Sequence, residues 1–423
     1  MDSGDTAWIL TSAALVLLMT PGVAFFYGGM VRATSVINMI LMSFGCIAIV
    51  SVIWPLFGFS LAFGPDAGAG LIGNLDHVGM SELLNKEQGT MPMLAFASFQ
   101  LMFAVITPAL ITGAIADRAK FSAWLIFAAL WTCLVYLPVA HWVFFLDDGN
   151  GGWIGDRLGA IDFAGGTAVH VNAGAAALAL AIVLGKRAGW PAKHTRPHNL
   201  PFVLLGAGLL WFGWFGFNAG SAGAANALAA TAFFNTQVAA SCAALAWIVV
   251  ERIRTGHITA LGMASGAIAG LVAITPACAS VNPLGALAIG AIAGAVCCFA
   301  VELKFRLGYD DSLDVVGVHL VGGIIGSVLI GLFATAATGG VDGLFYGGGW
   351  AQLGKQGLAV LAVGAYSFAL SYLLGKVIDK LIGFRVVAGH EADGVDFHQH
   401  RDVSYELPIP VSPAVDAPEK EKV

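Results

Sequence analysis

The sequence predicts an all-α polytopic membrane protein, and composition and run length both point to that fold class. Of the 423 residues, 58% are hydrophobic and only 11% are charged, and the mean hydropathy is +0.82. A soluble domain of this size carries about 25% charged residues. The 55 glycines lie mostly within long apolar runs, which favours closely packed transmembrane helices over the short alternating segments of a β-barrel.

Eleven apolar runs are long enough to cross about 30 Å of hydrocarbon. They lie near residues 6–28, 36–63, 92–116, 121–145, 163–185, 200–218, 230–251, 258–276, 284–304, 315–335 and 356–384. We therefore expect a membrane domain of eleven helices over residues 1–384 and a cytoplasmic tail over residues 385–423. The sixth run is short and glycine-rich, and the segment 217–227 after it predicts a broken or re-entrant stretch.

An odd number of spans places the two termini on opposite sides of the membrane. With the N-terminus outside, only three of the 20 Lys and Arg residues lie outside, and the other seventeen lie in the cytoplasm. The three outer cations are Lys86, Arg157 and Lys355. This bias follows the positive-inside rule, so we expect the N-out, C-in orientation. The charged residues lie in loops and in the tail, and they form no nucleic-acid patch.

The fifth and tenth predicted helices each carry one acid and one histidine in a glycine-rich apolar segment. The first is DFAGGTAVH, from Asp162 to His170, and the second is DVVGVH, from Asp314 to His319. In the expected topology these helices are antiparallel, as an inverted repeat of five plus five helices with a long final helix requires. Ionisable residues within a membrane are costly, so two in mirrored positions predict a functional pair. The alternative is that each histidine is a core residue bonded to a neighbouring helix.

Each aspartate is expected at the first turn of its helix, where a carboxylate accepts unpaired backbone N–H groups. On a regular helix, spacings of eight and five residues turn a side chain by about 80° and 140°, so neither aspartate shares a face with its histidine. At about 1.5 Å per residue, His170 lies about 12 Å and His319 about 7.5 Å from the start of its helix. Both histidines are therefore expected near mid-membrane depth.

Five motifs follow one another between residues 6 and 406. They are DFAGGTAVHVN, GWFGFNAGSAGAAN, RPHNLP, SGAIAGLVAITPAC and DVVGVHLVGGIIG. In this order they resemble the ammonium transporter family (Amt/Mep/Rh), in its bacterial Amt branch. The resemblance implies a homotrimer in the bacterial cell inner membrane, surrounded by lipid, with one pore per subunit.

The resemblance also implies roles for individual residues. The family's twin pore histidines fall on His170 and His319, and its stacked gate phenylalanines fall on Phe103 and Phe217. The outer ammonium site matches Phe103, Ser221 and the acid Asp162. Further motif positions, which we interpret as structural, are Asp314, Phe99 and Trp214.

The outer site departs from the family pattern. The family has a tryptophan in a stretch like AHxVWGGG, whereas this sequence has Phe144 in AHWVFFLDD, followed by an insertion that contains Asp147 and Asp148. A tryptophan face attracts a cation better than phenylalanine, by about 0.5–1 kcal/mol. We therefore expect weaker ammonium capture than with tryptophan, unless Trp142, Trp153 or the two inserted acids compensate.

The physical chemistry of the ligand agrees with these implied roles. Ammonium resembles potassium in size and charge, but it can lose a proton. Burial of an unpaired ion costs several kcal/mol, and a low dielectric favours neutral ammonia. The sequence therefore predicts a transporter that captures ammonium, or methylammonium as an analogue, deprotonates it and passes ammonia through a hydrophobic twin-histidine pore. Whether a proton crosses separately is left open.

Two other function classes were weighed against transport. An ammonium sensor on the same scaffold, with little flux, is the main alternative, and the altered aromatic at Phe144 favours it slightly. A membrane enzyme lacks support, because the sequence has no zinc motif, nucleophile elbow or phosphate loop. We expect no cofactor.

The polar tail from Arg385 contains EADGVDFHQHRDVSYEL, which is similar to the family's cytoplasmic regulatory tail. The resemblance implies that this tail couples the subunits of the trimer, and a PII-type regulatory protein is a candidate partner. His390, His398 and His400 could form a metal site, but without cysteines or an ordered fourth ligand a solvated tail is favoured and no metal is expected. Residues 412–423 predict a disordered end.

Overall fold

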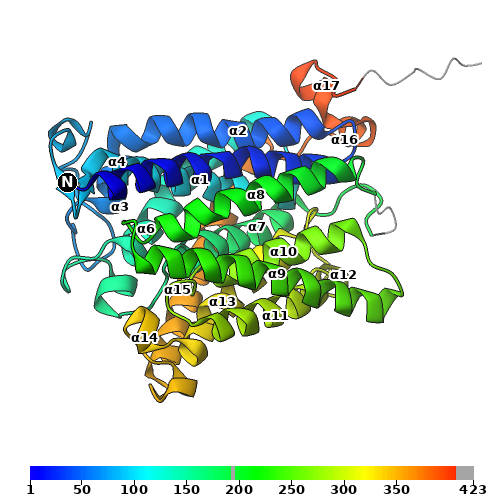
Figure 1. Cartoon of the computed structure of the whole chain (residues 1–423). Coiled ribbons are helices and arrows are strands. Elements are labelled where there is room, and N and C mark those ends of the chain that lie inside the picture. The colour runs from blue at the N-terminus through cyan, green and yellow to red at the C-terminus, as the bar shows by residue number, and fades with distance from the viewer. Residues whose placement is uncertain (192–195, 406–423) are drawn as a thin grey trace, which may run out of the picture.

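The computed structural model describes residues 1–191 and 196–405, and these form a bundle of helices with roughly parallel axes (Figure 1). Ten helical segments of this part are long and apolar enough to span a membrane: Ser3–Met30, Val36–Phe63, Met93–Ile115, Phe121–Phe144, Gly166–Leu184, Leu200–Gly220, Ala227–Thr255, Pro283–Leu307, Val316–Phe333 and Ala351–Ile382. An eleventh apolar helix, Ala260–Ile274, has only 15 residues. It ends two residues before Pro276, which has no N–H group to continue it.

Several of these segments combine an α-helix with a turn of another kind. The α-helices are α1 (Ser3–Met30), α2 (Val36–Ile53), α3 (Phe59–Phe63), α4 (Met93–Ile111), α5 (Phe121–Trp131), α6 (Leu137–Phe144), α7 (Asn172–Leu184), α8 (Leu200–Gly220), α9 (Ala227–Thr255), α10 (Ala260–Ile274), α11 (Pro283–Ala300), α12 (Leu303–Leu307), α13 (Val321–Phe333), α14 (Ala336–Gly339), α15 (Ala351–Ile382), α16 (Ala388–Asp393) and α17 (Val395–His400). The π-helical turns are Trp54–Gly58, Thr132–Tyr136, Trp153–Arg157, Gly166–Val171 and Val316–Leu320. The 3-10 turns are Ser81–Leu83, Thr112–Ile115 and Leu344–Tyr346. Strands β1 (Glu87–Gln88) and β2 (Met91–Pro92) form one antiparallel pair.

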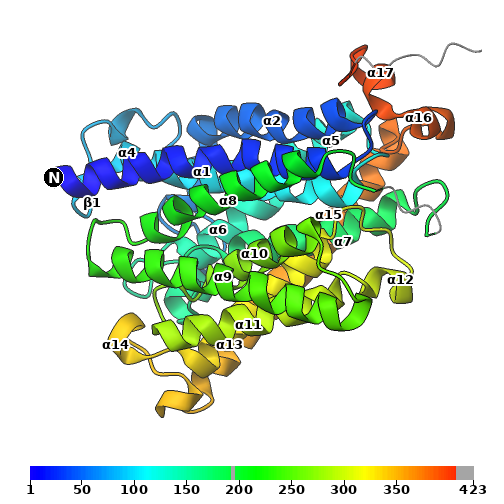
Figure 2. The same cartoon turned by 45° about the vertical axis from the view of Figure 1, so that its right-hand side comes forward.

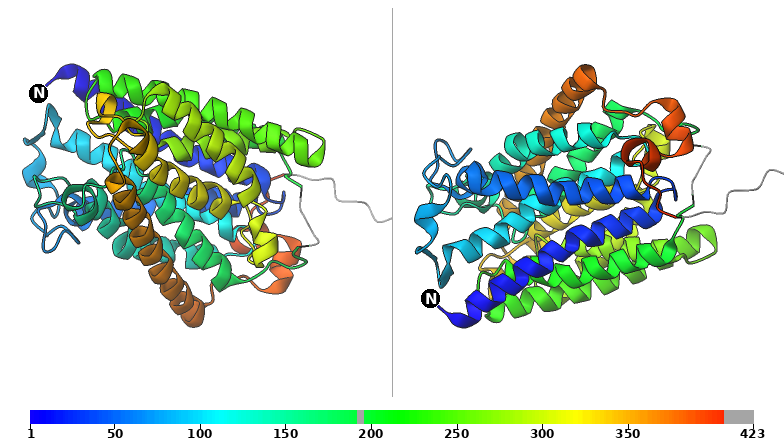
Figure 3. Two further views of the ribbon diagram at one scale, coloured as in Figure 1. Left: turned by 90° about the horizontal axis from the view of Figure 1, so that it is seen from below. Right: turned by 90° about the horizontal axis from the view of Figure 1, so that it is seen from above.

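The two ends of the described chain lie at opposite ends of the bundle. The N-terminus and the β1–β2 pair lie at one end, and α16 and α17 lie at the other (Figures 1 and 2). The final long helix, α15, has 32 residues and slants along the outside of the bundle (Figure 3). The expected long final helix is therefore present, whereas the expected number of eleven spans stays a prediction.

The expected re-entrant stretch over residues 217–227 is wrong. Helix α8 continues without a break to Gly220, and α9 begins at Ala227, so the segment between them is a short connection. Polar side chains close this helical hairpin: Asn218 Nδ2 donates to Thr236 Oγ1 at 2.9 Å, and Asn226 caps α9 by accepting from Ala229 N at 3.0 Å. Glycine content suggested a broken helix, but these hydrogen bonds produce a regular turn.

Candidate functional site

Both candidate pore histidines lie in π-helical turns. His170 belongs to the turn Gly166–Val171, which leads into α7, and His319 belongs to the turn Val316–Leu320, which leads into α13. Such turns are rare and are often found at functional sites. The expected angles of about 80° and 140° assumed a regular α-helix, so they do not apply to either segment.

Glycines allow the two histidine segments to cross closely. A Cβ atom at Gly174 would lie 2.5 Å from the backbone nitrogen of Leu320. A Cβ atom at Gly323 would lie 2.9 Å from the carbonyl oxygen of Gly166 and 3.1 Å from the Cβ of His170. A larger side chain at either position would push the segments apart, so this glycine pattern brings the two histidines together.

The two imidazole rings contact each other directly. Nδ1 of His170 lies 3.2 Å from Nδ1 of His319, and the ring planes are 19° apart with centroids at 5.3 Å. One Nδ1–H group therefore donates to the other Nδ1, which leaves one Nε2 lone pair and one Nε2–H group for a third molecule. Nε2 of His170 is buried without a partner in the described chain. Trp214 supports the pair, because its ring stacks on His170 at 5.4 Å and its Nε1 donates to Thr275 Oγ1 at 2.7 Å.

The histidine pair lines a narrow apolar lumen. The cavity has an accessible volume of about 10 Å³, which is close to the space that one water-sized molecule needs. Its other walls include side chains that the sequence did not single out: Met19, Val23, Tyr27, Ile106, Leu110 and Ile268. These are ordinary apolar or aromatic helix residues, and no pattern in the chain distinguishes them from packing residues.

Phe103 and Phe217 form a stacked pair at one end of this lumen. Their ring centroids are 4.1 Å apart, their planes differ by 13°, and they are 1% and 0% exposed. Phe217 lines the lumen, whereas Phe103 lines a second, wider cavity. Phe99 packs edge-on against Phe103 at 4.9 Å. The phenylalanine pair therefore separates the two cavities.

The wider cavity is an open vestibule of about 740 Å³ that contains all the residues matched to the outer site: Phe103, Phe144, Asp162 and Ser221. Phe144 meets Phe103 edge-on at 6.3 Å. Ser221 Oγ donates to the carbonyl oxygen of Phe217 at 2.8 Å, which leaves its lone pairs free to accept from a cation. The vestibule is also lined by residues that the sequence did not single out, among them Phe59, Phe63, Phe96, Gln100 and Phe145.

Asp162 caps the first histidine segment, as expected. Its carboxylate accepts from the backbone nitrogens of four residues at 2.6–3.1 Å: Gly165, Gly166, Thr167 and Ala168. The Thr167 hydroxyl donates to it as well. These donors are the unpaired N–H groups at the start of a helical segment, so Asp162 fixes where the His170 turn begins.

The same prediction is wrong for Asp314. Its backbone has a φ of +65° and lies outside the helix, and its Oδ1 accepts from Lys304 Nζ at 2.6 Å. Asp311 is the capping residue, because its Oδ2 accepts from Val316 N at 2.7 Å. The DVVGVH motif does not include Asp311, so the motif pointed to the wrong acid.

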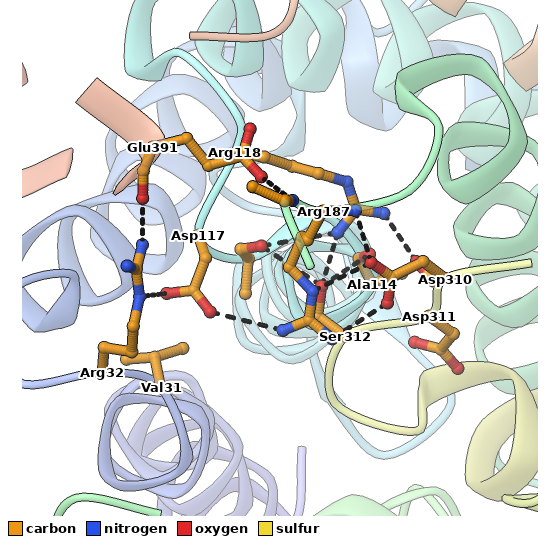
Figure 4. Close-up of polar contacts among 12 residues, drawn as sticks. Val31, Arg32, Ala114, Asp117, Arg118, Arg187, Asp310, Asp311, Ser312 and Glu391 are labelled. Atoms are coloured by element: carbon orange, nitrogen blue, oxygen red, sulfur yellow. Dashed lines mark hydrogen bonds and ion pairs between the residues drawn. The ribbon is translucent and has the colours of Figure 1, made fainter. Parts of the chain in front are cut away.

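A polar cluster lies at the end of the bundle away from the vestibule (Figure 4). Arg187 forms hydrogen bonds to both carboxylate oxygens of Asp310 at 2.9 and 3.0 Å, and it also contacts Asp117 at 3.3 Å. The fully buried Arg118 donates to the carbonyl oxygen of Asp310 at 2.6 Å and to Ser312 Oγ at 2.5 Å. Burial alone would raise the pKa of Asp310, but its contacts with Arg187 and Arg118 hold that pKa below its usual range.

The tail joins this cluster through Glu391. Arg32 donates to the carbonyl oxygen of Glu391 at 2.5 Å, and Glu391 Oε1 accepts from Ala188 N at 2.7 Å. Arg385 forms an ion pair with the same carboxylate at 2.7 Å. The tail helix α16 is therefore fastened to the loops that follow α1 and α7.

The second tail helix is fastened to α2. The Asp396 carboxylate accepts from Ile37 N at 3.0 Å and from Asn38 N at 2.8 Å. His400 Nε2 lies 2.9 Å from Asn38 Oδ1. The rings of His390 and His398 stack on each other at 3.8 Å, so the structure does not bring His400 together with them as a three-histidine site.

Comparison with known proteins gives concordant results. A sequence model of the Ammonium Transporter Family matches residues 7–405. An ammonium transporter of Mycobacterium bovis is 54% identical, over 96% of this chain and 91% of that protein. The crystal structure of Saccharomyces cerevisiae Mep2 is similar, with a TM-score of 0.84 and 35% identity over 92% of this chain and 91% of that one. A structure titled "Sensor Amt Protein" has a TM-score of 0.86 and 31% identity, over 94% of this chain and 98% of that one.

Proposed function

Because the chain belongs to the Ammonium Transporter Family, we propose that it captures ammonium in the vestibule and passes ammonia through the histidine-lined lumen. The observation that carries this proposal is the succession of two cavities. An open vestibule of about 740 Å³ is followed, beyond the Phe103–Phe217 pair, by an apolar lumen of about 10 Å³. The first cavity has room for a hydrated cation, and the second has room for one small molecule without its water.

Capture takes place on the vestibule side of the phenylalanine pair. Ammonium meets the aromatic faces of Phe103 and Phe144, an attraction of about 2 kcal/mol when the ion is desolvated, and donates a hydrogen bond to Ser221 Oγ. The carboxylate of Asp162 contributes negative charge, but its oxygens are already occupied by the cap of the His170 segment. It therefore acts as a structural residue, and direct contact with the ion falls to Ser221 and the rings.

Deprotonation precedes entry into the lumen. Loss of the N–H proton to vestibule water leaves neutral ammonia, whose entry avoids the cost of several kcal/mol for an unpaired ion in an apolar space. In the lumen, ammonia donates to the free Nε2 lone pair of the histidine pair and accepts from its Nε2–H group. Potassium has no proton to lose, so the same route excludes it.

Transport measurements on purified protein in liposomes test this proposal. We expect ammonium and methylammonium to produce a saturable flux or current that protein-free vesicles lack, and potassium to produce none. Replacement of both histidines by alanine leaves the vestibule intact. It should therefore change the passage of ammonia through the lumen and not the capture of ammonium in the vestibule. Equal conduction of potassium, or no ammonium flux at any concentration, would overturn the transporter assignment.

An ammonium sensor is the second candidate. The likeness to the structure titled "Sensor Amt Protein", together with phenylalanine at position 144, favours it. A sensor on this scaffold binds ammonium with little flux and passes the signal to a cytoplasmic partner. Measurable methylammonium binding by protein that shows no current in liposomes would support the sensor over the transporter.

The proposal extends to assembly and orientation. Residues 1–384 form the membrane domain of a homotrimer in the bacterial inner membrane, oriented N-out and C-in, and residues 385–423 form its cytoplasmic regulatory tail. The position of α16 and α17 at the far end from the N-terminus supports this division. Three of the lysines that were predicted to be cytoplasmic lie outside the described residues: Lys193, Lys420 and Lys422. The predicted disordered end at 412–423 lies outside them as well. Native mass spectrometry tests the trimer, and a binding assay with a PII-type protein tests the regulator.

A further inference from the structure

We propose that Asp147 is the anionic capture residue of the vestibule, and that its charge compensates for the phenylalanine at position 144. This inference rests on the proposed function and adds to it a residue from the insertion that departs from the family pattern. Asp147 lines the same vestibule as Phe103, Phe144 and Ser221. A carboxylate at the mouth of an aromatic cavity raises the local concentration of a monovalent cation such as ammonium.

The two tryptophans near the outer site do not replace the missing indole. Trp142 and Trp153 pack against each other, with ring centroids 5.7 Å apart, and neither lines the vestibule. The indole N–H of Trp142 donates to the carbonyl oxygen of Leu71 at 2.7 Å. Both rings therefore pack among the outer loops. Compensation for the tryptophan that Phe144 replaces must come from another group.

Three other acids close to the vestibule already have partners. Asp162 caps the His170 segment with both of its oxygens. Asp156 Oδ2 accepts from the backbone nitrogens of Gly149 and Gly151 at 2.8 and 2.7 Å. Asp66 forms an ion pair with Arg157 at 2.7 Å and lies 3.4 Å from His141 Nε2. Each of these carboxylates stabilises a segment of the outer face.

The Asp147 carboxylate differs, because in the described part of the chain it accepts no hydrogen bond and forms no ion pair. Its backbone is nevertheless held in place: its carbonyl oxygen accepts from Asn150 N at 2.8 Å. Two residues earlier, the carbonyl oxygen of Phe145 accepts from Gly152 N at 2.7 Å, and the Phe145 ring stacks on the His141 ring at 4.8 Å. A fixed backbone thus presents an exposed, unpaired carboxylate to the vestibule.

Lys355 places a positive charge close to a residue that lines the vestibule. A Cβ atom placed on Gly159, which also lines the vestibule, would lie 3.1 Å from Lys355 Nζ. Arg157 is neutralised by Asp66. Asp147 and Lys355 are therefore expected to act on cation capture with opposite signs.

The experiment compares Asp147→Asn with Asp148→Asn. Both variants remove one negative charge from adjacent exposed positions, but Asp148 does not line the vestibule. We expect Asp147→Asn to raise the half-saturating methylammonium concentration about two- to five-fold in liposomes at low ionic strength, the range typical of one exposed charge. Asp147→Glu should restore the wild-type value, and Lys355→Gln should lower it. The difference in half-saturating concentration between wild type and Asp147→Asn should shrink at about 1 M salt, where the screening length falls to about 3 Å.

Equilibrium binding of labelled methylammonium to the purified variants gives a second readout that does not depend on flux. The inference about Asp147 would be overturned if the half-saturating methylammonium concentration and methylammonium binding were equal in wild type, Asp147→Asn and Asp148→Asn. Transport by the wild type would in that case leave the proposed function standing. Equal losses in both asparagine variants would also overturn it, because net surface charge would then explain the effect. If the wild type binds methylammonium but does not transport it, the transporter assignment fails. The comparison of methylammonium binding among the variants still decides the role of Asp147.

Discussion

At the scale of single residues, the candidate site consists of side chains from distant segments that line two adjoining cavities. The motif resemblance selected the two histidines, the stacked Phe103–Phe217 pair and Ser221, all of which lie along these cavities, and their roles in transport stay predictions. The wrong prediction that Asp314 caps its helix shows the limit of selecting residues from motifs. Asp311 and Asp314 are three residues apart and chemically identical, and only the backbone path decides which of them reaches Val316 N.

Phe144→Trp is expected to improve ammonium capture. Phe144 lines an open vestibule, so the larger ring can be accommodated, and its face attracts a cation more strongly by about 0.5–1 kcal/mol. The half-saturating ammonium concentration should fall about two- to five-fold. Because this attraction acts at contact distance, the gain should persist in high salt, unlike the effect of Asp147. An unchanged or raised half-saturation value would show that capture is not governed at Phe144.

Asp311→Asn is expected to flatten the dependence of stability on pH. Burial, opposed by the Lys304 ammonium and reinforced by Asp314, raises the pKa of Asp311 to about 6 in the folded protein. The usual aspartate value is about 3.9, so the folded state holds a proton that the unfolded chain has lost. Stability therefore falls as pH rises through the window from about 4 to about 6, and it stays reduced above that window.

The variant removes this titration and keeps a side-chain carbonyl oxygen that can accept from Val316 N. Unfolding in detergent, followed from pH 4 to 7, should show a loss of about 1–3 kcal/mol in the wild type that the variant lacks. Parallel pH profiles for the two proteins would contradict the assignment.

At the scale of elements, the apolar runs predicted the helices, because long hydrophobic segments of this kind leave no other structure that satisfies the backbone within a bilayer. Local conformation was not predictable in the same way. The π-helical turns at His170 and His319 lie where the segments cross closely at Gly174 and Gly323, and these crossings are contacts between segments far apart in the chain. Similarly, glycine composition suggested a break after α8, where the hydrogen bond from Asn218 to Thr236 and the local cap of Asn226 close a helical hairpin.

Asp162→Asn should destabilise the protein more than Asp314→Asn. Asp162 accepts from four backbone nitrogens at the start of the His170 segment, whereas Asp314 accepts from a single lysine. Hydrogen bonds to a charged group contribute about 1.5–3 kcal/mol, and an amide offers only one acceptor oxygen. Thermal unfolding in detergent should place the Asp162 variant several degrees below the Asp314 variant. The reverse order would mean that the cap is not a main determinant of this segment.

Phe217→Ala should join the two cavities and weaken selectivity. Its ring stacks on Phe103 between vestibule and lumen, so its removal opens an apolar constriction to water. A matched control is Phe215→Ala on the same helix, since Phe215 also stacks on a phenylalanine at 4.1 Å but lines neither cavity. Potassium current in liposomes should appear or increase with Phe217→Ala only. Unchanged selectivity in both variants would make Phe217 a packing residue.

At the scale of the whole molecule, the N-terminus and the tail helices α16 and α17 lie at opposite ends of the bundle, and these tail helices are attached to it through specific contacts. The sequence marked this tail as polar and similar to a regulatory segment, but it could not show where the tail attaches. Attachment depends on pairings such as Arg32 with the Glu391 carbonyl oxygen, which join residues more than 350 positions apart.

Glu391→Ala is expected to release the tail from the bundle. The buried carboxylate binds both Arg385 and Ala188 N, so its loss removes the ion pair and the hydrogen bond through which α16 is attached to the bundle. Limited proteolysis should cleave the variant near residues 385–400 several-fold faster than the wild type. Asp393→Ala is the control, because the carboxylate of this exposed acid on the same helix pairs, within the described part of the chain, with His398 alone, at 3.5 Å. Equal cleavage of both variants would contradict a specific role for Glu391.

The unequal sizes of the two cavities also determine where a membrane voltage acts. In the proposed orientation, water and ions fill the open vestibule of about 740 Å³ and keep it close to the outer potential, so most of the voltage falls across the narrow segment beyond Phe103. A charge that crosses the whole membrane gains or loses about 2.3 kcal/mol per 100 mV. A cation held near Asp147 and Ser221 feels little of this field, and a neutral molecule in the lumen feels none. Voltage should therefore change the maximal current, if a proton crosses separately, while leaving the half-saturating ammonium concentration almost unchanged.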